Sequence, residues 1–310
     1  MTIEEKRKYL LDLLEKPEDF ADKQSLNFAK FTGSGTKRKI QRLIFAPEIY
    51  LKHLEVKFLR RIGINPKKHY YNVNLYGLKN IRIKEAESNL NNDLLPLFFA
   101  EYNLTKFFVK NLKEDDIFYD IGANFGFYTH LALEFCKEVH SFEPQPEEFE
   151  NLSNNLKDDR RVFLNNVALS NNDGITKLLL AEESSSIISE IQTELSKEFK
   201  QEIEVKTTTL DDYLKARNKP TILKIDVEGA ENLVLEGGKE FFKINSPIIA
   251  MEVWGDYFNN GKNKNHKSAV KFLKDLGYKC YKINDNGELN LINEPDYQNL
   301  ETYDNFVFKK

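Results

Sequence analysis

The pattern of apolar and polar positions changes near residue 100. Before that point, residues 3–15 carry their leucines with helical period, and residues 71–76 and 81–84 alternate apolar and polar side chains across Gly77. Beyond it, short apolar runs alternate with longer stretches of helical period, which predicts a mainly parallel sheet with helices on both faces. We therefore expect a mainly helical accessory region with one hairpin over residues 1–100 and an α/β domain over residues 101–310.

Seven short apolar runs are the expected core strands of the α/β domain. They cover residues 117–119, 139–142, 162–164, 222–225, 248–252, 278–283 and 306–308. Two further runs, at 176–180 and 203–206, are expected to form additional strands on either side of a loop rich in serine and glutamate.

Composition and charge exclude several classes of protein. The chain has 310 residues and a formal charge of −4, which gives no general reason to expect nucleic-acid binding. It has no run of about 18 apolar residues that would span a bilayer, and its charged first residues argue against a secretion signal. Only two cysteines, Cys136 and Cys280, are present, too few for a disulfide framework. We expect a cytoplasmic globular protein.

Residues 117–135 combine a strand, a glycine turn and a helical pattern. Asp120 closes the strand, and Gly122 and Gly126 bound the turn. Glycine suits a turn that needs a positive φ or a close ligand, and ligands of open α/β sheets bind at the carboxyl ends of the strands. A second acid, Glu143, ends the next strand about twenty residues on, where nucleotide-binding βαβ units place the acceptor for ribose hydroxyls. The two acids and the turn predict a ribose-containing cofactor.

The details of the turn distinguish between cofactors. The G-x-G-x-x-G spacing that binds a pyrophosphate is absent, and the carboxylate of Asp120 would repel an anionic pyrophosphate. The same carboxylate would attract a ligand with an amino group and a sulfonium. S-adenosylmethionine fits this description.

Several ordered blocks resemble the FkbM-type S-adenosylmethionine-dependent methyltransferases. They are FYDIGANFGFYT at 118–129, SFEPQP at 141–146, NVALS at 166–170 followed by Gly174, TTTLD at 207–211 and LKIDVEGAE at 223–231. The resemblance runs from about residue 101 to about residue 283 and implies a Rossmann-like class I methyltransferase fold. That fold has a seven-stranded, mostly parallel sheet whose last strand is antiparallel. The resemblance also implies O-methylation, often of sugar hydroxyls in glycans or natural products.

The resemblance and the position of each block assign cofactor contacts. Glu143 would bind the ribose hydroxyls, and Thr129 would either reach the carboxylate of the ligand or pack within the first helical turn. Asn124 stands where the wider methyltransferase pattern often has a third glycine, but it is normal for the FkbM group. The expected contacts are Asp120, Gly122, Ala123, Asn124 and Gly126 with the methionine end, Asn166 and Val167 with the adenine, and Asp226 with the cofactor beside the transferred methyl group.

Two acids are candidates for the base that assists the acceptor hydroxyl. Lys224 and Asp226 lie at the carboxyl end of one expected strand, and Glu252 ends another, so we group these three as catalytic residues. A carboxylate is too weak a base to deprotonate an alcohol fully. Either the proton leaves late in the reaction, or a divalent metal lowers the pKa of the hydroxyl. Asp226, Glu228 and Glu252 are suitable ligands for magnesium or manganese, although their spacing does not require a metal.

Other residues near these acids have two interpretations. Glu228 and Glu231 fall in a first helical turn, where negative charge is favourable regardless of chemistry. Trp254, Tyr257 and Phe258 follow Glu252 and would suit a sugar ring, but core packing explains them equally well. Of the histidines, His130 and His140 are expected to pack, whereas His53, His69 and His266 fall in no motif.

The leading hypothesis is an S-adenosylmethionine-dependent O-methyltransferase that acts on a sugar of a glycan, polysaccharide or glycosylated metabolite. The alternatives are an NAD-dependent oxidoreductase and a non-catalytic glycan-binding protein on the same fold. The basic run KRKIQR at 37–42 and the helical pattern that continues to residue 61 suggest contact with an anionic membrane or a lipid-linked acceptor. A solvated helical face explains the same residues.

Overall fold

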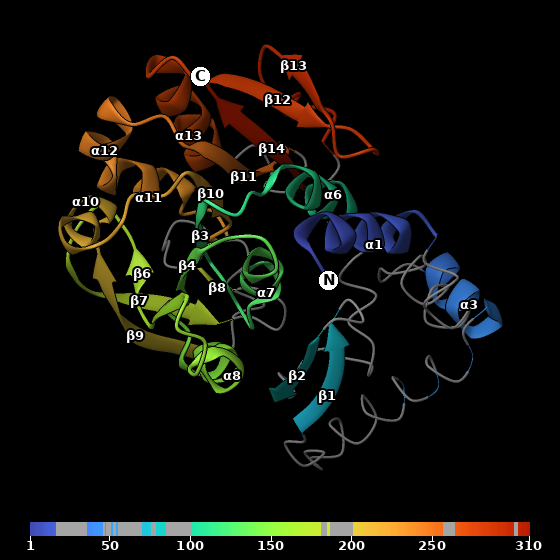
Figure 1. Ribbon diagram of the computed structural model, residues 1–310. Helices are drawn as coiled ribbons and strands as arrows, with labels where there is room; N and C mark the ends of the chain where they lie inside the picture. Colours follow the sequence, from blue (N-terminus) through green and yellow to red (C-terminus); the bar gives the residue numbers. More distant parts are fainter. Residues whose placement is uncertain are drawn as a thin grey trace. The chain divides into compact units, whose positions relative to one another are not determined.

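The computed structural model describes residues 1–16, 36–45, 70–75, 79–84, 101–180, 185–186, 201–256, 264–300 and 303–310, together with residues 47, 51 and 54. The chain forms two compact units, Met1–Lys110 and Asn111–Lys310. Figure 1 labels most elements of both units.

The first unit begins with helix α1 (Ile3–Glu15), whose start is fixed by a capping box. The hydroxyl of Thr2 accepts from the backbone of Glu5 at 3.2 Å, and the carboxylate of Glu5 accepts from the backbone of Thr2 at 2.7 Å. Strands β1 (Tyr70–Leu75) and β2 (Lys79–Lys84) pair antiparallel, and α6 (Tyr102–Asn111) follows them. The predicted first helix and hairpin are therefore confirmed.

Helix α3 (Thr36–Phe45) contains the basic run that the sequence singled out. It carries no acidic residue, and Ile40, Leu43 and Ile44 are exposed along it. Most of the helical pattern predicted onward to residue 61 lies outside the described residues, as do His53 and His69.

The second unit is built on one open sheet. Its order is β13-β12-β14-β11-β10-β3-β4-β5, and the strands from β11 to β5 are parallel to one another. β14 runs antiparallel between β11 and β12, as predicted for the last strand. The bounds are β3 (Ile117–Ile121), β4 (Glu138–Phe142), β5 (Val162–Asn165), β10 (Ile222–Ile225), β11 (Ile248–Trp254), β12 (Lys279–Ile283), β13 (Leu289–Ile292) and β14 (Tyr303–Lys309).

The sheet has eight strands, so the prediction of seven was one strand short. The additional strand is β13, which pairs antiparallel with β12 at the edge of the sheet. It reads Leu-Asn-Leu-Ile and is not fully buried at any position, so it lacks the continuous apolar run of a buried strand. The turn that contains Asn286 and Gly287 was the signal available in the sequence for this hairpin.

Helices cover both faces of the sheet (Figure 1). Helices α11 (Glu231–Gly237), α12 (Lys239–Ile244) and α13 (Lys264–Asp275) pack on the face that carries Tyr119, Leu223 and Met251. Helix α7 (Phe127–Leu133) covers the opposite face, and α8 (Pro146–Leu156) begins with a proline that suits a first helical position. β3 is buried at all five positions, as expected of a central parallel strand.

A smaller sheet carries the two additional strands predicted from the sequence. Its order is β6 (Ala168–Leu169), β9 (Gln201–Thr208), β7 (Gly174–Leu180) and β8 (Ser185–Ser186). α10 (Leu210–Tyr213) and the short 3-10 helix η2 (Leu214–Ala216) lead from it back to β10. In the parts of the chain described, no helix is long and apolar enough to cross a membrane.

Candidate cofactor and acceptor site

The expected functional residues meet at the carboxyl ends of neighbouring parallel strands. Asp120 of β3 is in register with Lys224 of β10, and the last residue of β10, Ile225, is in register with Met251 of β11. The next residue of each strand is therefore a neighbour of the others at this edge of the sheet. These residues are Glu143 after β4, Gly122 after β3, Asp226 after β10 and Glu252 within β11.

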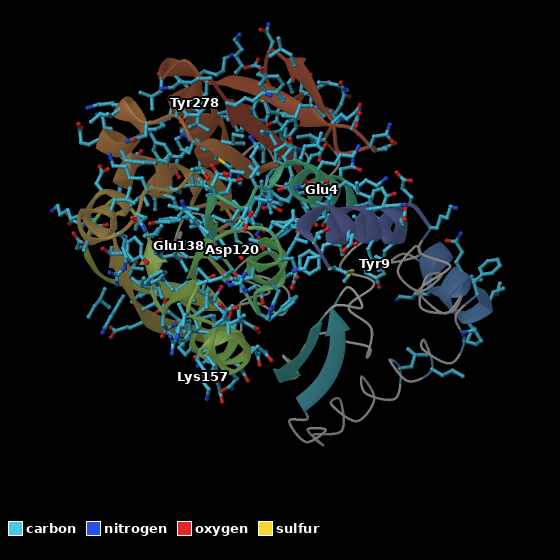
Figure 2. All side chains as sticks on the ribbon, viewed as in Figure 1. Glu4, Tyr9, Asp120, Glu138, Lys157 and Tyr278 are labelled. Carbon is cyan, nitrogen blue, oxygen red and sulfur yellow. The ribbon has the colours of Figure 1, made fainter. Side chains whose placement is uncertain are left out.

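Asp120 is the most buried acid of this edge (Figure 2). Its side chain has no solvent exposure, and its Oδ2 accepts a hydrogen bond of 2.6 Å from the hydroxyl of Thr129. Its Oδ1 is buried and has no hydrogen-bond partner among the residues that the structure describes. Burial raises the pKa of Asp120, whereas the charge of Lys224 and the hydrogen bond from Thr129 oppose the rise. The hydroxyl of Thr129 also forms a hydrogen bond of 2.7 Å with the hydroxyl of Ser141. Thr129 is thus fixed in the first turn of α7, where it contacts Asp120.

The turn after β3 needs glycine at two positions. Gly122 has φ 82° and Gly126 has φ 95°, both in the left-handed region. A Cβ on Gly126 would lie 2.4 Å from a methyl carbon of Leu152. Asn124 also adopts a left-handed φ of 53°, a conformation that asparagine tolerates better than most residues. The turn from Gly122 to Gly126 therefore has a left-handed backbone at three positions, which leaves its backbone open to a closely packed neighbour.

Glu143 closes this turn from β4. One carboxylate oxygen accepts from the backbone of Asn124 and the other from the backbone of Gln145, each at 2.8 Å. Burial raises the pKa of Glu143 to about 7, although these two backbone donors oppose the rise. Beside it, the amide of Asn166 donates to the backbone oxygen of Glu143, and Val167 packs against the core.

Lys224 and Asp226 form an ion pair at the end of β10. The Lys224 Nζ lies 2.9 Å from the Asp226 carboxylate and 5.0 Å from the centre of the Tyr128 ring on α7. Lys224 is 4% exposed, whereas Asp226 is only half-buried. A buried cation thus holds an accessible carboxylate beside Asp120.

The segment after Asp226 has an unusual backbone. Glu228 has φ 55° and Gly229 has φ 96°, two consecutive left-handed residues. The carboxylate of Glu231 accepts from the backbone of Val227 at 3.0 Å and of Gly229 at 3.3 Å, the two residues that flank Glu228. Helix α11 begins at Glu231, so the prediction that Glu228 lies in its first turn was wrong. The helix-end role is filled by Glu231, which closes the turn through its side chain.

Glu252 differs from Asp226 in its surroundings. It is 5% exposed, and its Oε2 accepts a hydrogen bond of 2.6 Å from the indole of Trp254. Burial, together with the charges of Asp226, Glu228 and Glu231, raises the pKa of Glu252 well above its usual range. Glu252 is therefore harder to ionise than an exposed glutamate, whereas the carboxylate of Asp226 is accessible and paired with Lys224.

The expected metal site is not preassembled. Among the described residues, no three histidine, cysteine, aspartate or glutamate side chains form a group that could hold a metal ion. The carboxylate of Asp226 is paired with Lys224, and that of Glu252 accepts from Trp254, so both already have other partners. The residues present do not fit magnesium or manganese.

The structure assigns most of the remaining candidates to packing. Trp254 is 3% exposed and lies against the ring of His266 at 4.9 Å, so its ring is not a free platform for a sugar. Tyr257 and Phe258 lie outside the described residues. His130 is buried in α7, and His140 stacks between Tyr119 and Phe163. His266 is the residue near the site that the sequence did not indicate, because no motif surrounds it.

The mostly parallel sheet with one antiparallel strand inserted between β11 and β12, and the acid and glycine turn after β3, define a class I methyltransferase fold. Residues 120–280 match the family model described as the methyltransferase FkbM domain. The chain belongs to the FkbM methyltransferase family.

One curated relative is the hexuronic acid methyltransferase AglP of Haloferax volcanii. The two chains are 29% identical over 144 residues, which cover 44% of this chain and 56% of AglP. The chain therefore spans about half the length of the curated relative that it matches.

Two solved structures resemble the fold. The methyltransferase FkbM of Methylobacillus flagellatus is 12% identical with a TM-score of 0.42, and the match covers 96% of this chain and 60% of that one. The precorrin-6y C5,15-methyltransferase of Geobacter metallireducens is 15% identical with a TM-score of 0.36, and the match covers 67% of this chain and 87% of that one.

Proposed function

We propose that this chain transfers a methyl group from S-adenosylmethionine to a hydroxyl of a sugar. The observation that carries the proposal is the buried Asp120 Oδ1, which has no hydrogen-bond partner in the described part of the chain. A buried carboxylate oxygen without a partner is costly, and a cationic ligand with an amino group would supply the missing donor. Membership of a methyltransferase family supports the same cofactor.

The remaining cofactor contacts follow from the same edge of the sheet. The Gly122–Gly126 backbone would hold the methionine end, together with Ala123 and Asn124. Each oxygen of Glu143 accepts only one backbone hydrogen bond, so each has a lone pair left for a ribose hydroxyl. Asn166 and Val167, which follow β5, would border the adenine.

The reaction needs alignment more than acid–base power. When bound, S-adenosylmethionine supplies a methyl group that is already activated on a sulfonium. The protein has to hold an acceptor hydroxyl in line with that group and receive its proton as the new carbon–oxygen bond forms. Asp226 is our candidate for the base, because it is accessible and Lys224 holds it at 2.9 Å. Glu252, which burial makes harder to ionise, would form a hydrogen bond with the acceptor and not act as the base.

We base the proposed class of acceptor on the curated relative AglP and on the acidic side chains of the site. AglP is named for hexuronic acid, so a uronic acid or a related hexose within a glycan is the acceptor that we propose. Sugar hydroxyls are hydrogen-bond donors that suit the carboxylates of Asp226 and Glu228.

Calorimetry tests the cofactor and mass spectrometry tests the transfer. Titration with S-adenosylmethionine, with NADH as the competing cofactor and EDTA as the metal check, should give saturable binding of S-adenosylmethionine alone and no effect of EDTA. Methyl hexuronosides and methyl hexosides are then incubated with the protein and the cofactor. Asp120→Asn should lose cofactor binding, whereas Asp226→Asn should keep binding and lose methyl transfer. Binding of NADH instead would overturn the proposal, and binding without transfer to any sugar would indicate a glycan-binding protein.

A further inference from the structure

The turn that follows Asp226 is held from two sides by polar side chains. Glu231, which has no solvent exposure, accepts from the backbone of Val227 and Gly229 and so closes the turn from α11. From α13, the side-chain amide of Asn265 donates to the backbone oxygen of Gly229 at 3.1 Å. A non-glycine residue such as Glu228 adopts a left-handed conformation only when its surroundings impose it. Here Glu231 and α13 impose it.

His266 connects this turn to Glu252. Its Nδ1 lies 3.3 Å from the second carboxylate oxygen of Glu231, within ion-pair distance, and its ring lies 4.9 Å from that of Trp254. The indole of Trp254 in turn donates to Glu252. Glu231, His266, Trp254 and Glu252 thus form one continuous buried series from the end of β10 to the end of β11, and each is at most 5% exposed.

Packing alone does not explain these residue types. A buried acid and a buried histidine lose hydration, and apolar residues of similar volume would fill the same space at lower cost. Neither ring nitrogen of His266 has a hydrogen-bond partner among the described residues, so Nδ1 meets Glu231 at ion-pair distance only. The polar series lies where the two candidate catalytic acids must be aligned, next to Asp226.

We propose that Glu231 and His266 are positioning residues that hold the turn after Asp226 and, through Trp254, fix Glu252, so that both acids are aligned on the acceptor. This inference rests on the proposed function and extends it to residues that do not touch the reacting atoms. Misplacement of a reacting group by about 1 Å lowers a rate by about 100-fold, so loss of the pair should lower kcat and leave cofactor affinity unchanged.

The test compares His266→Leu, His266→Asn and the wild type. Calorimetry gives the Kd for S-adenosylmethionine, and kcat is measured on a methyl hexuronoside or hexoside that the wild type methylates. His266→Leu should lower kcat by about 10- to 100-fold with a Kd within about twofold of the wild type. His266→Asn, which can place an amide near Nδ1, should recover most of the rate. Leu273→Val, a core substitution two turns further along α13, should leave kcat unchanged.

A spectroscopic readout is available because Trp254 is the only tryptophan. Its emission should change in His266→Leu and return toward the wild-type spectrum in His266→Asn. If His266→Leu does not fold, Glu231→Gln, which keeps an acceptor for the turn, should lower kcat in the same way. A kcat within about twofold of the wild type in the folded variant, or an equal loss in Leu273→Val, overturns the inference.

Failure of the proposed function is distinguishable from failure of this inference. A wild-type protein that does not bind S-adenosylmethionine contradicts the function alone. If the wild type methylates no sugar, hydrogen exchange at the Val227 and Gly229 amides decides the inference. Faster exchange in His266→Leu than in Leu273→Val supports it, and equal exchange overturns it.

Discussion

A Cβ on Gly122 would lie 1.8 Å from the backbone oxygen of Asp226, so the glycine turn after β3 and the end of β10 touch through their backbones. Gly122→Ala meets this contact and a φ of 82° together. Because backbone cannot yield as a flexible side chain does, we expect the turn to be displaced, with a loss of about 3 kcal/mol of stability and of S-adenosylmethionine binding. Urea unfolding and calorimetry check the two effects.

Gly277 supplies a matched control for this substitution. Its φ of 87° is similar, but nothing lies within 4 Å of the position that a Cβ would take. Gly277→Ala should therefore cost only the backbone penalty, about 1–2 kcal/mol, and leave cofactor binding intact. Equal losses in the two variants would show that the contact with Asp226 has no effect.

The hydroxyl of Thr129 should matter for the cofactor through Asp120. Thr129→Val removes the donor at 2.6 Å, which raises the pKa of Asp120 further and disfavours its charged form. A hydrogen bond to a charged group contributes about 1.5–3 kcal/mol, so we expect affinity for S-adenosylmethionine to fall about tenfold or more by calorimetry.

A second hydrogen bond between a threonine and an aspartate, at the amino-terminal ends of β3 and β10, provides a control for Thr129→Val. The hydroxyl of Thr221 donates to Asp116 at 2.7 Å, before β10 and β3 begin. Thr221→Val should destabilise the fold and leave the cofactor Kd unchanged. A similar loss of affinity in both variants would contradict a specific role for Thr129.

Glu143 predicts a pH dependence of stability. Its pKa is about 7 in the folded protein against 4.5 for the free side chain, so the folded state binds a proton more tightly. The stabilisation is fully present below pH 4.5 and is lost as the pH rises to about 7, a change of roughly 3 kcal/mol. Urea unfolding of the wild type and Glu143→Gln across this range isolates the effect, since other groups titrate in both. A constant difference between the two proteins would contradict it.

Helix α3 allows a test of membrane contact. Its sequence has four basic residues and no acid, and Ile40, Leu43 and Ile44 are exposed. We expect binding to vesicles that contain phosphatidylglycerol to fall when Lys37, Arg38 and Lys39 become glutamate, as measured by co-sedimentation. Reversal of Lys157, Lys239 and Lys279, three exposed lysines of the second unit, changes the net charge equally and should have no effect. Unchanged binding in the first variant would exclude the contact.

The sequence predicted the strands of the main sheet well because burial on both faces leaves continuous apolar runs, as in β3 and β10. It also predicted which residues gather at the carboxyl ends, since parallel strands place them at one edge. It could not assign different roles to Asp226 and Glu252. That difference comes from the burial of Glu252 and its bond from Trp254, both of which depend on tertiary packing.

The position of β14 has a consequence for synthesis of the protein. β14 lies between β11 and β12, although both precede it in the chain, and its Asn305 is in register with Glu252. A nascent chain therefore cannot complete the surroundings of Glu252 until Lys309 has left the ribosome. Until then β11 and β12 have unpaired edges, which are prone to aggregation, so this fold should depend on protection of the growing chain.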